Sequence, residues 1–410
     1  MMFKTPAGLY RRIILLFSVS INLGLLFYFK YSNFFIENLN SVFSVFNLTG
    51  VHWTKLILPI GISFYTFESI TYAVDVYRGL HKPLVHFWDY QLYIILFPKL
   101  IAGPIVRYHE IADQIIDRTL NETIDNKLTG LYRFSLGLAK KIIIANPIGK
   151  QADIIFAMNY STLDIYTAWV GILAYTFQIY FDFSGYTDMA IGMAKMLGFK
   201  FPENFNNPYT SRSITEFWRR WHITLSAWMR NYLYIPLGGN RGTSKYRMFF
   251  NLGFVFLVSG LWHGASWSFI VWGAYHGMFI ILERGWLLKK YDQIGKFLST
   301  FITFLLVIVG WVFFRVENLG DAFIYLKKMF TLHLKNVSFD YEFYVLMVLA
   351  GLFAFFAYGP KGKEIQDAVF IDPYTYKRHI VMTIVSVGLL ILSVSMISTF
   401  GFNPFIYFRF

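Results

Sequence analysis

The sequence predicts an all-α, polytopic membrane protein, and three observations support this fold class. Of its 410 residues, 56% are hydrophobic and only 15% are charged, whereas a soluble domain carries about 25% charged residues. Several apolar runs approach the roughly 20 residues that a helix needs to cross a hydrocarbon core. Polar and basic stretches separate these runs. We therefore expect one transmembrane domain over residues 1–410, a helical bundle with about eight to ten membrane segments plus re-entrant and interfacial helices.

The charge and cysteine content narrow the function classes. The formal net charge is +13, which would suit either nucleic acid or cytoplasmic loops that contact anionic lipid. Because the basic residues lie between long apolar runs, we favour the loops, with membrane lipid and no nucleic acid as partner. The chain has no cysteine, so disulfides, thiolate catalysis and cysteine-ligated metals are excluded. No metal-binding motif is found.

The first expected elements are two spans and a shorter segment. Ile13–Phe35 and Leu56–Val76 each fit a span, although the second contains Glu68 and Asp75. Tyr90–Val106 is shorter and contains Pro and Gly, so we expect it to enter the membrane and turn back. The remaining expected segments are Leu128–Ala145 at the interface, Ile165–Phe183 as a span, Met189–Phe199 as a separate short helix, Ile294–Phe314 as a span, Ala322–Leu334 as an amphipathic surface helix, and Tyr341–Tyr358 and Ile380–Phe400 as spans.

The longest apolar run is Met248–Leu282. As one helix it would extend roughly 50 Å, too far for a perpendicular crossing. It must tilt strongly or break, and we expect a break within Ser259–Gly264, where two glycines flank His263. The basic stretch over residues 211–247 has one acid, Glu216, so the positive-inside rule places it in the cytoplasm.

His263 is the first candidate for chemistry. An imidazole in an apolar, Trp-rich segment is neutral, because desolvation disfavours the charged form. A neutral imidazole can act as a general base for a hydroxyl that attacks a thioester. A structural histidine, hydrogen-bonded between helices, is the alternative interpretation.

The second candidate segment is Glu216–Tyr232. Read as one helix, it places Trp218, Trp221, Leu225 and Trp228 on one stripe and Arg219, Arg220 and Arg230 off that stripe. This pattern is typical of an interfacial helix with Trp in the headgroup layer, which could be only an anchor. The functional alternative has His222 pointing inward while the arginines attract a phosphate-rich donor such as coenzyme A.

Two further segments carry polar residues at membrane depth. In Gln178–Asp188, Asp182 lies among aromatic residues and needs a partner. It could orient a histidine or pair with an arginine, or it could cap a helix that starts near Asp188. In Phe97–His109, Pro and Gly end regular helix, which suggests the wall of a cavity.

The motifs together resemble a known family. The stretches are Gln178–Gly192, Pro202–Tyr209, Glu216–Tyr232, Ser259–Gly264, Ile62–Phe67, Phe97–Pro104 and Phe405–Phe410. They resemble the membrane-bound O-acyltransferases, in particular the bacterial alginate O-acetyltransferase branch, over nearly the whole chain. The resemblance implies a bowl of helices with a thinned centre, with His263 as the catalytic histidine and His222 as a second one. Supporting or substrate-binding candidates are Asp182, Arg219, Arg220, Trp262, Tyr180 and Asn231.

The resemblance also implies substrates and partners. Acetyl-CoA, or an acyl carrier protein, would supply the acyl group from the cytoplasm, and no cofactor would be bound permanently. An extracytoplasmic partner of the Ser-His-Asp hydrolase type would complete O-acetylation of a polysaccharide, outside a bacterial inner membrane. Relatives usually begin with a further hydrophobic hairpin, whereas this sequence starts almost directly at the segment that follows it. Two explanations stay open: a short member of the family, or a sequence trimmed of N-terminal helices. Three alternatives stay open: D-alanyl transfer to teichoic acid, a glycan or lipid transporter, and a non-catalytic scaffold.

Overall fold

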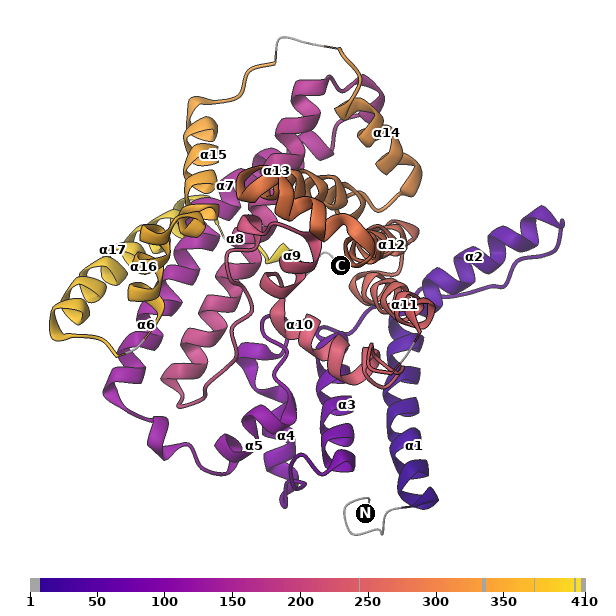
Figure 1. Cartoon of the computed structure of the whole chain (residues 1–410), viewed down its shortest axis with the longest axis horizontal. Helices are drawn as coiled ribbons and strands as arrows, with labels where there is room; N and C mark the ends of the chain where they lie inside the picture. The colour runs from indigo at the N-terminus through magenta and orange to yellow at the C-terminus, as the bar shows by residue number, and fades with distance from the viewer. Residues whose placement is uncertain (1–7, 243, 334–336, 372, 402, 407–410) are drawn as a thin grey trace. The chain divides into compact units, whose positions relative to one another are not determined.

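The computed structural model describes residues 8–242, 244–333, 337–371, 373–401 and 403–406. Within these residues every regular element is an α-, 3₁₀- or π-helix, apart from one isolated antiparallel bridge between Phe205 and Trp221 (Figure 1). The expected all-α class is confirmed. The chain divides into two compact units, Met1–Leu120 and Asn121–Phe410. The prediction of a single domain stays a prediction.

The N-terminal unit is built around α3. Its elements are α1 (Leu9–Leu26), a π-helical turn (Phe27–Tyr31), α2 (Ser32–Val45), α3 (Ile62–Arg78), α4 (Phe87–Ile95), a 3₁₀ turn (Phe97–Lys99) and α5 (Tyr108–Ile116). Helix α3 packs against α1, α4 and α5. The expected span from Leu56 becomes helical only at Ile62, because Gly61 in the left-handed region ends the preceding turn.

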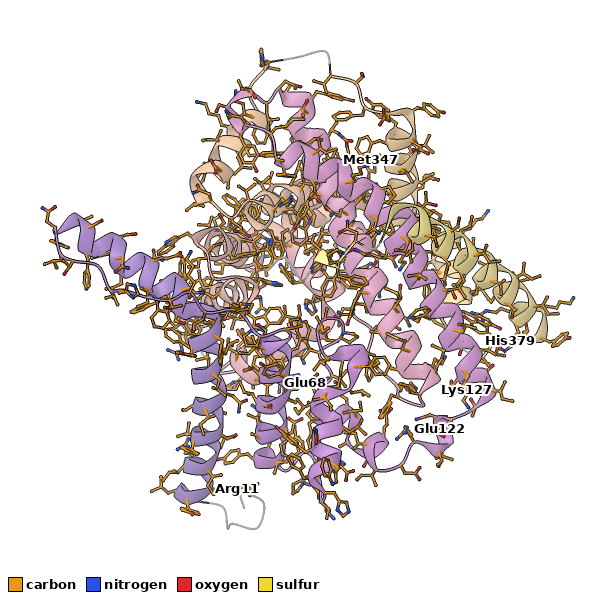
Figure 2. All side chains as sticks on the ribbon, turned by 180° about the vertical axis from the view of Figure 1, so that it is seen from behind. Arg11, Glu68, Glu122, Lys127, Met347 and His379 are labelled. Carbon is orange, nitrogen blue, oxygen red and sulfur yellow. The ribbon has the colours of Figure 1, made fainter. Side chains whose placement is uncertain are left out.

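Charges inside this unit are paired. Glu68 of α3 (Figure 2) lies 2.6 Å from the Nζ atom of Lys99, and both side chains are buried. Regular helix after Tyr90 ends at Ile95, and residues 100–107 have no helix, as Pro98, Gly103 and Pro104 predicted. A buried charge is tolerated at such depth only with a partner, so the Glu68–Lys99 pair explains how the irregular segment is held.

The C-terminal unit surrounds the long helix α8. Its α-helices are α6 (Ile124–Ala139), α7 (Asn146–Phe156), α8 (Ile165–Met196), α9 (Ile214–Arg220), α10 (Ile223–Trp228), α11 (Lys245–His263), α12 (Trp267–Leu282), α13 (Leu288–Arg315), α14 (Leu319–Met329), α15 (Tyr341–Ala354), α16 (Pro360–Phe370) and α17 (Tyr376–Phe400). Helix α8 is buried along most of its length and packs against α6, α7, α13, α14 and α15. Helix α17 covers α6, where His379 (Figure 2) lies 2.8 Å from Asp125.

The expectation of a separate short helix over Met189–Phe199 is wrong, because α8 runs unbroken from Ile165 to Met196. Gly185 lies against the backbone of α6, since a Cβ there would come within 2.7 Å of the Gly137 carbonyl oxygen. No helix starts near Asp188, so Asp182 does not cap one. Asp188 itself pairs with Lys140 at 2.6 Å and with Arg133 at 2.9 Å. The Ser184-Gly185 pair therefore permits close packing of α8 on α6 and does not break the helix.

The break expected within Met248–Leu282 is confirmed. Helix α11 ends at His263, and Ser266 caps the start of α12. The two helices pack together. A Cβ on Gly260 would lie 2.3 Å from the Phe269 carbonyl oxygen, and a Cβ on Gly273 would lie 2.3 Å from that of Phe256. Gly260 therefore stays helical and permits the close crossing, while the chain turns after His263.

Four helical segments in the described part of the chain are long and apolar enough to cross a membrane. They are Leu9–Val45, Trp267–Arg315, Tyr341–Tyr358 and Tyr376–Thr399. The protein is thus a multi-pass membrane protein, while the expected count of eight to ten membrane segments stays a prediction. The amphipathic helix expected over Ala322–Leu334 is α14, which buries Ala322, Tyr325 and Met329 and exposes Phe323. Leu334 lies outside the described residues.

Candidate functional site

The helix expected over Glu216–Tyr232 is interrupted at His222. Helix α9 ends at Arg220, α10 begins at Ile223, and His222 between them has a left-handed backbone with φ 45° and ψ 54°. An antiparallel strap, residues 204–206, bridges the break. The Asn206 amide donates to the Arg220 carbonyl at 2.9 Å, and the Ile223 amide donates to the Asn204 carbonyl at 3.0 Å. Because of this break, the direction of the His222 side chain is not set by the face of either helix.

The aromatic stripe of this segment faces protein rather than headgroups. Trp218, Trp221, Leu225 and Trp228 are all buried. Trp221 packs against Trp311 of α13 and Phe205 of the strap, with ring centroids 4.9 Å and 5.0 Å apart. The interpretation as an interfacial anchor with Trp in the headgroup layer is therefore wrong, because these side chains are buried inside the protein, with Trp218 against α11 and α12 and Trp221 against α13.

His222 is held in one orientation. Its ring is fully buried and meets Phe183 edge to face at 4.8 Å. Its Nδ1 atom lies 3.1 Å from Asn204 Oδ1, which also accepts from the Thr224 amide at 3.2 Å and from the Thr224 hydroxyl at 2.8 Å. Burial lowers the pKa of His222 to about 3. The imidazole is therefore neutral at physiological pH.

His263 lies in an aromatic box at the end of α11. Its buried ring lies 4.9 Å from the ring of Trp262, 5.0 Å from Trp272 and 5.2 Å from Phe314. The ring of Trp262 also lies 6.2 Å from that of His222. The structure thus brings the two histidines named from the sequence into contact with one tryptophan. Apolar surroundings of this kind strengthen electrostatic and hydrogen-bond effects at a reacting centre.

A cavity of about 370 Å³ lies beside this box. Helices α9 to α12 line it, with Trp218, Arg219, Arg230, Ser259 and Arg284 among its walls. This volume is within the range of small-molecule sites, about 300–1,000 Å³. Ser259 lies one helical turn before His263 on α11 and so on the same face. The cavity therefore approaches the box from a side that carries three arginines.

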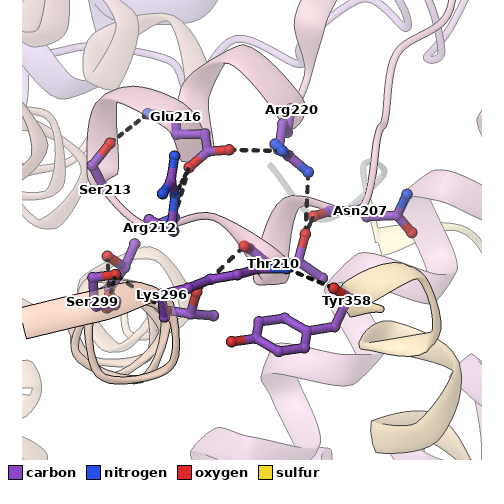
Figure 3. A network of polar contacts seen from close by, with 12 residues as sticks. Asn207, Thr210, Arg212, Ser213, Glu216, Arg220, Lys296, Ser299 and Tyr358 are labelled. Carbon is purple, nitrogen blue, oxygen red and sulfur yellow. Dashed lines mark hydrogen bonds and ion pairs between the residues drawn. The ribbon is translucent and has the colours of Figure 1, made fainter. Parts of the chain in front are cut away.

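The neighbouring Arg220 has a different position from Arg219. Figure 3 shows its guanidinium between Glu216, at 2.7 Å, and the Thr210 hydroxyl, at 3.1 Å. Glu216 also accepts from the Arg212 amide at 2.8 Å. Nearby, Lys296 of α13 donates to the Tyr358 carbonyl at 2.7 Å (Figure 3). Of the two arginines named together from the sequence, Arg220 braces α9 against the turn Pro208–Thr210, whereas Arg219 lines the cavity.

Glu283 anchors the start of α9 from a distant element. This buried carboxylate, in the π-helical turn after α12, accepts from the Ile214 amide at 2.6 Å and the Thr215 amide at 2.8 Å. These amides belong to the first turn of α9, which has no intrahelical acceptor for them. Glu283 was not identified from the sequence. An acid directly after a long apolar run was the only available signal.

Asp182 is paired with a lysine. It forms an ion pair with Lys141, and its other oxygen accepts from the Ile406 amide at 2.8 Å. Lys141 also donates to the Pro404 carbonyl at 3.1 Å. Asp182 thus joins α8 to residues 404–406, so the structure gives it a partner different from the histidine or arginine weighed from the sequence.

The last two candidates, Tyr180 and Asn231, have different surroundings. The buried ring of Tyr180 packs against those of Tyr209 and Trp221, at 5.2 Å and 6.2 Å. Asn231 is half-buried in the π-helical turn Met229–Tyr234, next to the cavity residue Arg230. Their positions make Tyr180 a core residue and leave Asn231 beside the cavity.

A third buried histidine, His276 on α12, was not singled out from the sequence. Its ring contacts Trp218 at 5.3 Å and Trp272 at 5.1 Å. Neither of its nitrogens has a hydrogen-bond partner among the described residues. The available signal was its spacing of four residues from Trp272, which puts both on one helix face. His276 thus lies behind the tryptophan that contacts His263.

Comparison with known proteins gives a family match and several related sequences. Residues 78–289 match the model of the MBOAT, membrane-bound O-acyltransferase family. A probable alginate O-acetylase AlgI of Azotobacter vinelandii is 42% identical over 422 residues, covering 96% of this chain and 84% of that protein. That of Pseudomonas aeruginosa is 49% identical over 317 residues, covering 77% of this chain, and the match spans 60% of that relative's length. A peptidoglycan O-acetyltransferase of Helicobacter pylori is 41% identical over 356 residues, covering 80% of this chain and 66% of that protein.

Proposed function

Because this chain belongs to the membrane-bound O-acyltransferase family, we propose that it moves an acetyl group from acetyl-CoA toward a hydroxyl of a bacterial surface polysaccharide. The observation that carries the proposal is the position of His263. A buried imidazole ends α11, one turn beyond Ser259, which lines a cavity with three arginines. Family membership supports the acyl chemistry, and this arrangement supports the residues assigned to it.

His263 is the proposed general base. It takes the proton of the attacking hydroxyl as that oxygen forms a bond to the thioester carbonyl carbon. The carbon–sulfur bond then breaks, and the proton passes to the departing thiolate, which leaves as the free thiol. Base catalysis of this kind is typically worth about 10²–10⁴-fold. The sequence has no cysteine, so no acyl-thiol enzyme forms.

The cavity is the proposed site of the acyl donor. Arg219, Arg230 and Arg284 line it and are exposed, which suits the phosphate groups of coenzyme A. Apolar side chains, among them Leu252, Val255 and Ile280, complete the wall of the cavity. They suit the uncharged arm of coenzyme A. The basic stretch over residues 211–247 faces the cytoplasm by the positive-inside rule. Donor entry from that side supports a location in the bacterial inner membrane.

The acceptor and its partner follow from the relatives. Those compared above are named for alginate and for peptidoglycan, and both polymers carry free hydroxyls outside the inner membrane. We propose that a sugar hydroxyl is acetylated first, and that an extracytoplasmic protein of the Ser-His-Asp hydrolase type then completes the transfer to the polysaccharide. D-alanyl transfer from a carrier protein is tested as the alternative donor chemistry.

The test uses the purified protein in lipid vesicles with acetyl-CoA labelled in its acetyl group. Release of coenzyme A and labelling of an added oligosaccharide are measured for the wild type and for His263→Gln. We expect His263→Gln to lower turnover at least about 100-fold without changing the melting temperature by more than a few degrees. His109→Gln, on the other compact unit, is the control for loss of a histidine. Equal turnover in the wild type and His263→Gln would refute the assignment, and transfer only from a D-alanyl carrier would replace acetyl as the donated group.

A further inference from the structure

The geometry points to Asn204 as a positioning residue that keeps the proton of His222 on Nδ1, so that Nε2 presents a lone pair to a second hydroxyl of the acceptor. This inference rests on the proposed function, because it assigns His222 to the acceptor rather than to the donor. Three roles are open to His222 in this reaction: holding the donor, holding the acceptor, or protonating the leaving thiolate. The hydrogen bonds around Asn204 exclude the last role and favour the acceptor.

The amide of Asn204 faces His222 with its oxygen. The same atom, Oδ1, receives the main-chain amide of Thr224 at 3.2 Å and the Thr224 hydroxyl at 2.8 Å. A main-chain N–H is always a donor, so the group that receives it is the oxygen of Asn204 and not its NH₂. His222 Nδ1 lies 3.1 Å from that oxygen and must therefore be the protonated nitrogen.

The other nitrogen is then an acceptor. A neutral imidazole carries one N–H, so a proton on Nδ1 leaves a lone pair on Nε2. Nε2 is buried and has no hydrogen-bond partner within the described residues. A buried polar atom without a hydrogen-bond partner in the protein is rare, and a bound ligand can supply that partner. A lone pair pairs with a donor such as an O–H, which an acceptor sugar has and the thioester group itself lacks. Coenzyme A also has N–H and O–H donors in its arm, so the KM of acetyl-CoA is measured beside that of the acceptor.

Asn204 is held firmly enough to impose this choice. Its carbonyl accepts from the Ile223 amide, and the Asn206 amide donates to the Arg220 carbonyl. One residue earlier, Glu203 forms an ion pair with Arg133 of α6, and Arg133 also binds Asp188 of α8 at 2.9 Å. The strap is thus tied on both sides of Asn204, so its side chain keeps its position when the ligand changes.

This arrangement also excludes one role. A thiolate needs an N–H, and His222 Nε2 has none, so His222 does not protonate the leaving group. The proton removed by His263 is returned from His263. His222 instead binds a hydroxyl adjacent to the attacking one and orients the sugar, an effect expected in the KM of the acceptor more than in that of the donor.

Three variants test the inference in the vesicle assay. Asn204→Leu removes the acceptor oxygen, and we expect the KM of the acceptor to rise about tenfold at every pH, the loss of one hydrogen bond, while the KM of acetyl-CoA is unchanged. Asn204→Asp keeps an oxygen for Thr224 but adds a charge that stabilises protonated His222. Its KM should match the wild type at high pH and rise as the pH falls. The matched control is Asn206→Asp, because Asn206 is an exposed residue of the same strap. Its acceptor KM should not rise as the pH falls.

A readout independent of turnover separates this inference from the proposed function. Nitrogen-15 spectra of protein labelled in its histidine side chains, compared with His222→Gln, report which nitrogen of His222 carries the proton. We expect Nδ1 in the wild type and a mixture in Asn204→Leu. Protonation of His222 on Nε2 would overturn the inference. So would a rise of the acceptor KM at low pH in Asn206→Asp as well as in Asn204→Asp. If the spectra agree but the wild type transfers no acetyl group, the proposed function fails and the positioning by Asn204 stands.

Discussion

Gly310 of α13 makes room for the imidazole of His276. A Cβ at this position would lie 2.9 Å from His276 Nε2 and 3.3 Å from Tyr275 Cε1. His276 is fully buried among Phe217, Trp218 and Trp272, so its ring cannot withdraw. Single atoms at this contact decide whether α12 and α13 fit together.

We predict that Gly310→Ala destabilises the protein by about 1–3 kcal/mol, the usual effect of overpacking. In an open helix the same change stabilises by up to about 1 kcal/mol, so the sign of the effect tests the contact. Gly388→Ala in α17, where a Cβ would meet nothing within 4 Å, is the matched control. Thermal unfolding in detergent measures both, and a stabilised Gly310→Ala would show that α12 and α13 lie further apart than described.

At the scale of elements, the short helix α9 is positioned mainly by groups outside it. Glu283 receives its first amides, Arg220 joins its end to Thr210, and the strap holds the residue after it. An isolated helix of this length is unstable in water. Its orientation, and that of His222 after it, therefore depends on these outside contacts.

We predict that Glu283→Gln lowers stability by about 1–3 kcal/mol, because its NH₂ group would face a main-chain amide and leave a buried donor unpaired. Turnover should fall with it, since α9 carries Trp218 and Arg219 of the cavity. The control is Asp292→Asn, which changes an exposed acid on α13 and should lower neither stability nor turnover. Hydrogen exchange of the α9 amides locates the effect, and wild-type protection in Glu283→Gln would contradict the capping role.

Elements were predictable where the apolar pattern alone decides, and not where packing does. The turn after His263 was visible because Met248–Leu282 is too long for one crossing. The continuity of α8 through Ser184-Gly185 and the interruption at Trp221-His222 were both missed. The first depends on α6 approaching Gly185, and the second on Asn204 and Asn206, which lie some fifteen residues earlier in the chain. Local propensity contains neither contact.

At the scale of the C-terminal unit, ion pairs connect segments that are far apart in the sequence. Asp182 and Lys141 join α8 to the π-helical segment before α7, and both bind the main chain at residues 404–406. The sequence indicated that Asp182 needed a partner but could not identify it. The same holds for the site, where His222 and His263 were named from local motifs, while Asn204 and His276 acquire their positions only in the folded unit.

We predict that Asp182→Asn is destabilising by about 3–5 kcal/mol, because it leaves the buried Lys141 without its counter-charge. Lys141→Met should cost a similar amount. The double variant should lose clearly less stability than the two single losses added together, since no unpaired charge remains. A double-mutant cycle in thermal unfolding measures the coupling, and simple additivity would contradict a direct buried pair.

The left-handed backbone at His222 places stability and activity in opposition. A non-glycine residue in this conformation costs about 1–3 kcal/mol, whereas glycine or asparagine adopts it readily. Glycine at position 222 would leave a cavity, so a laboratory selection that rewards heat resistance alone would favour asparagine there. Such selection would enrich well-folded molecules that had lost the imidazole, so any effort to engineer this membrane protein must score turnover alongside robustness.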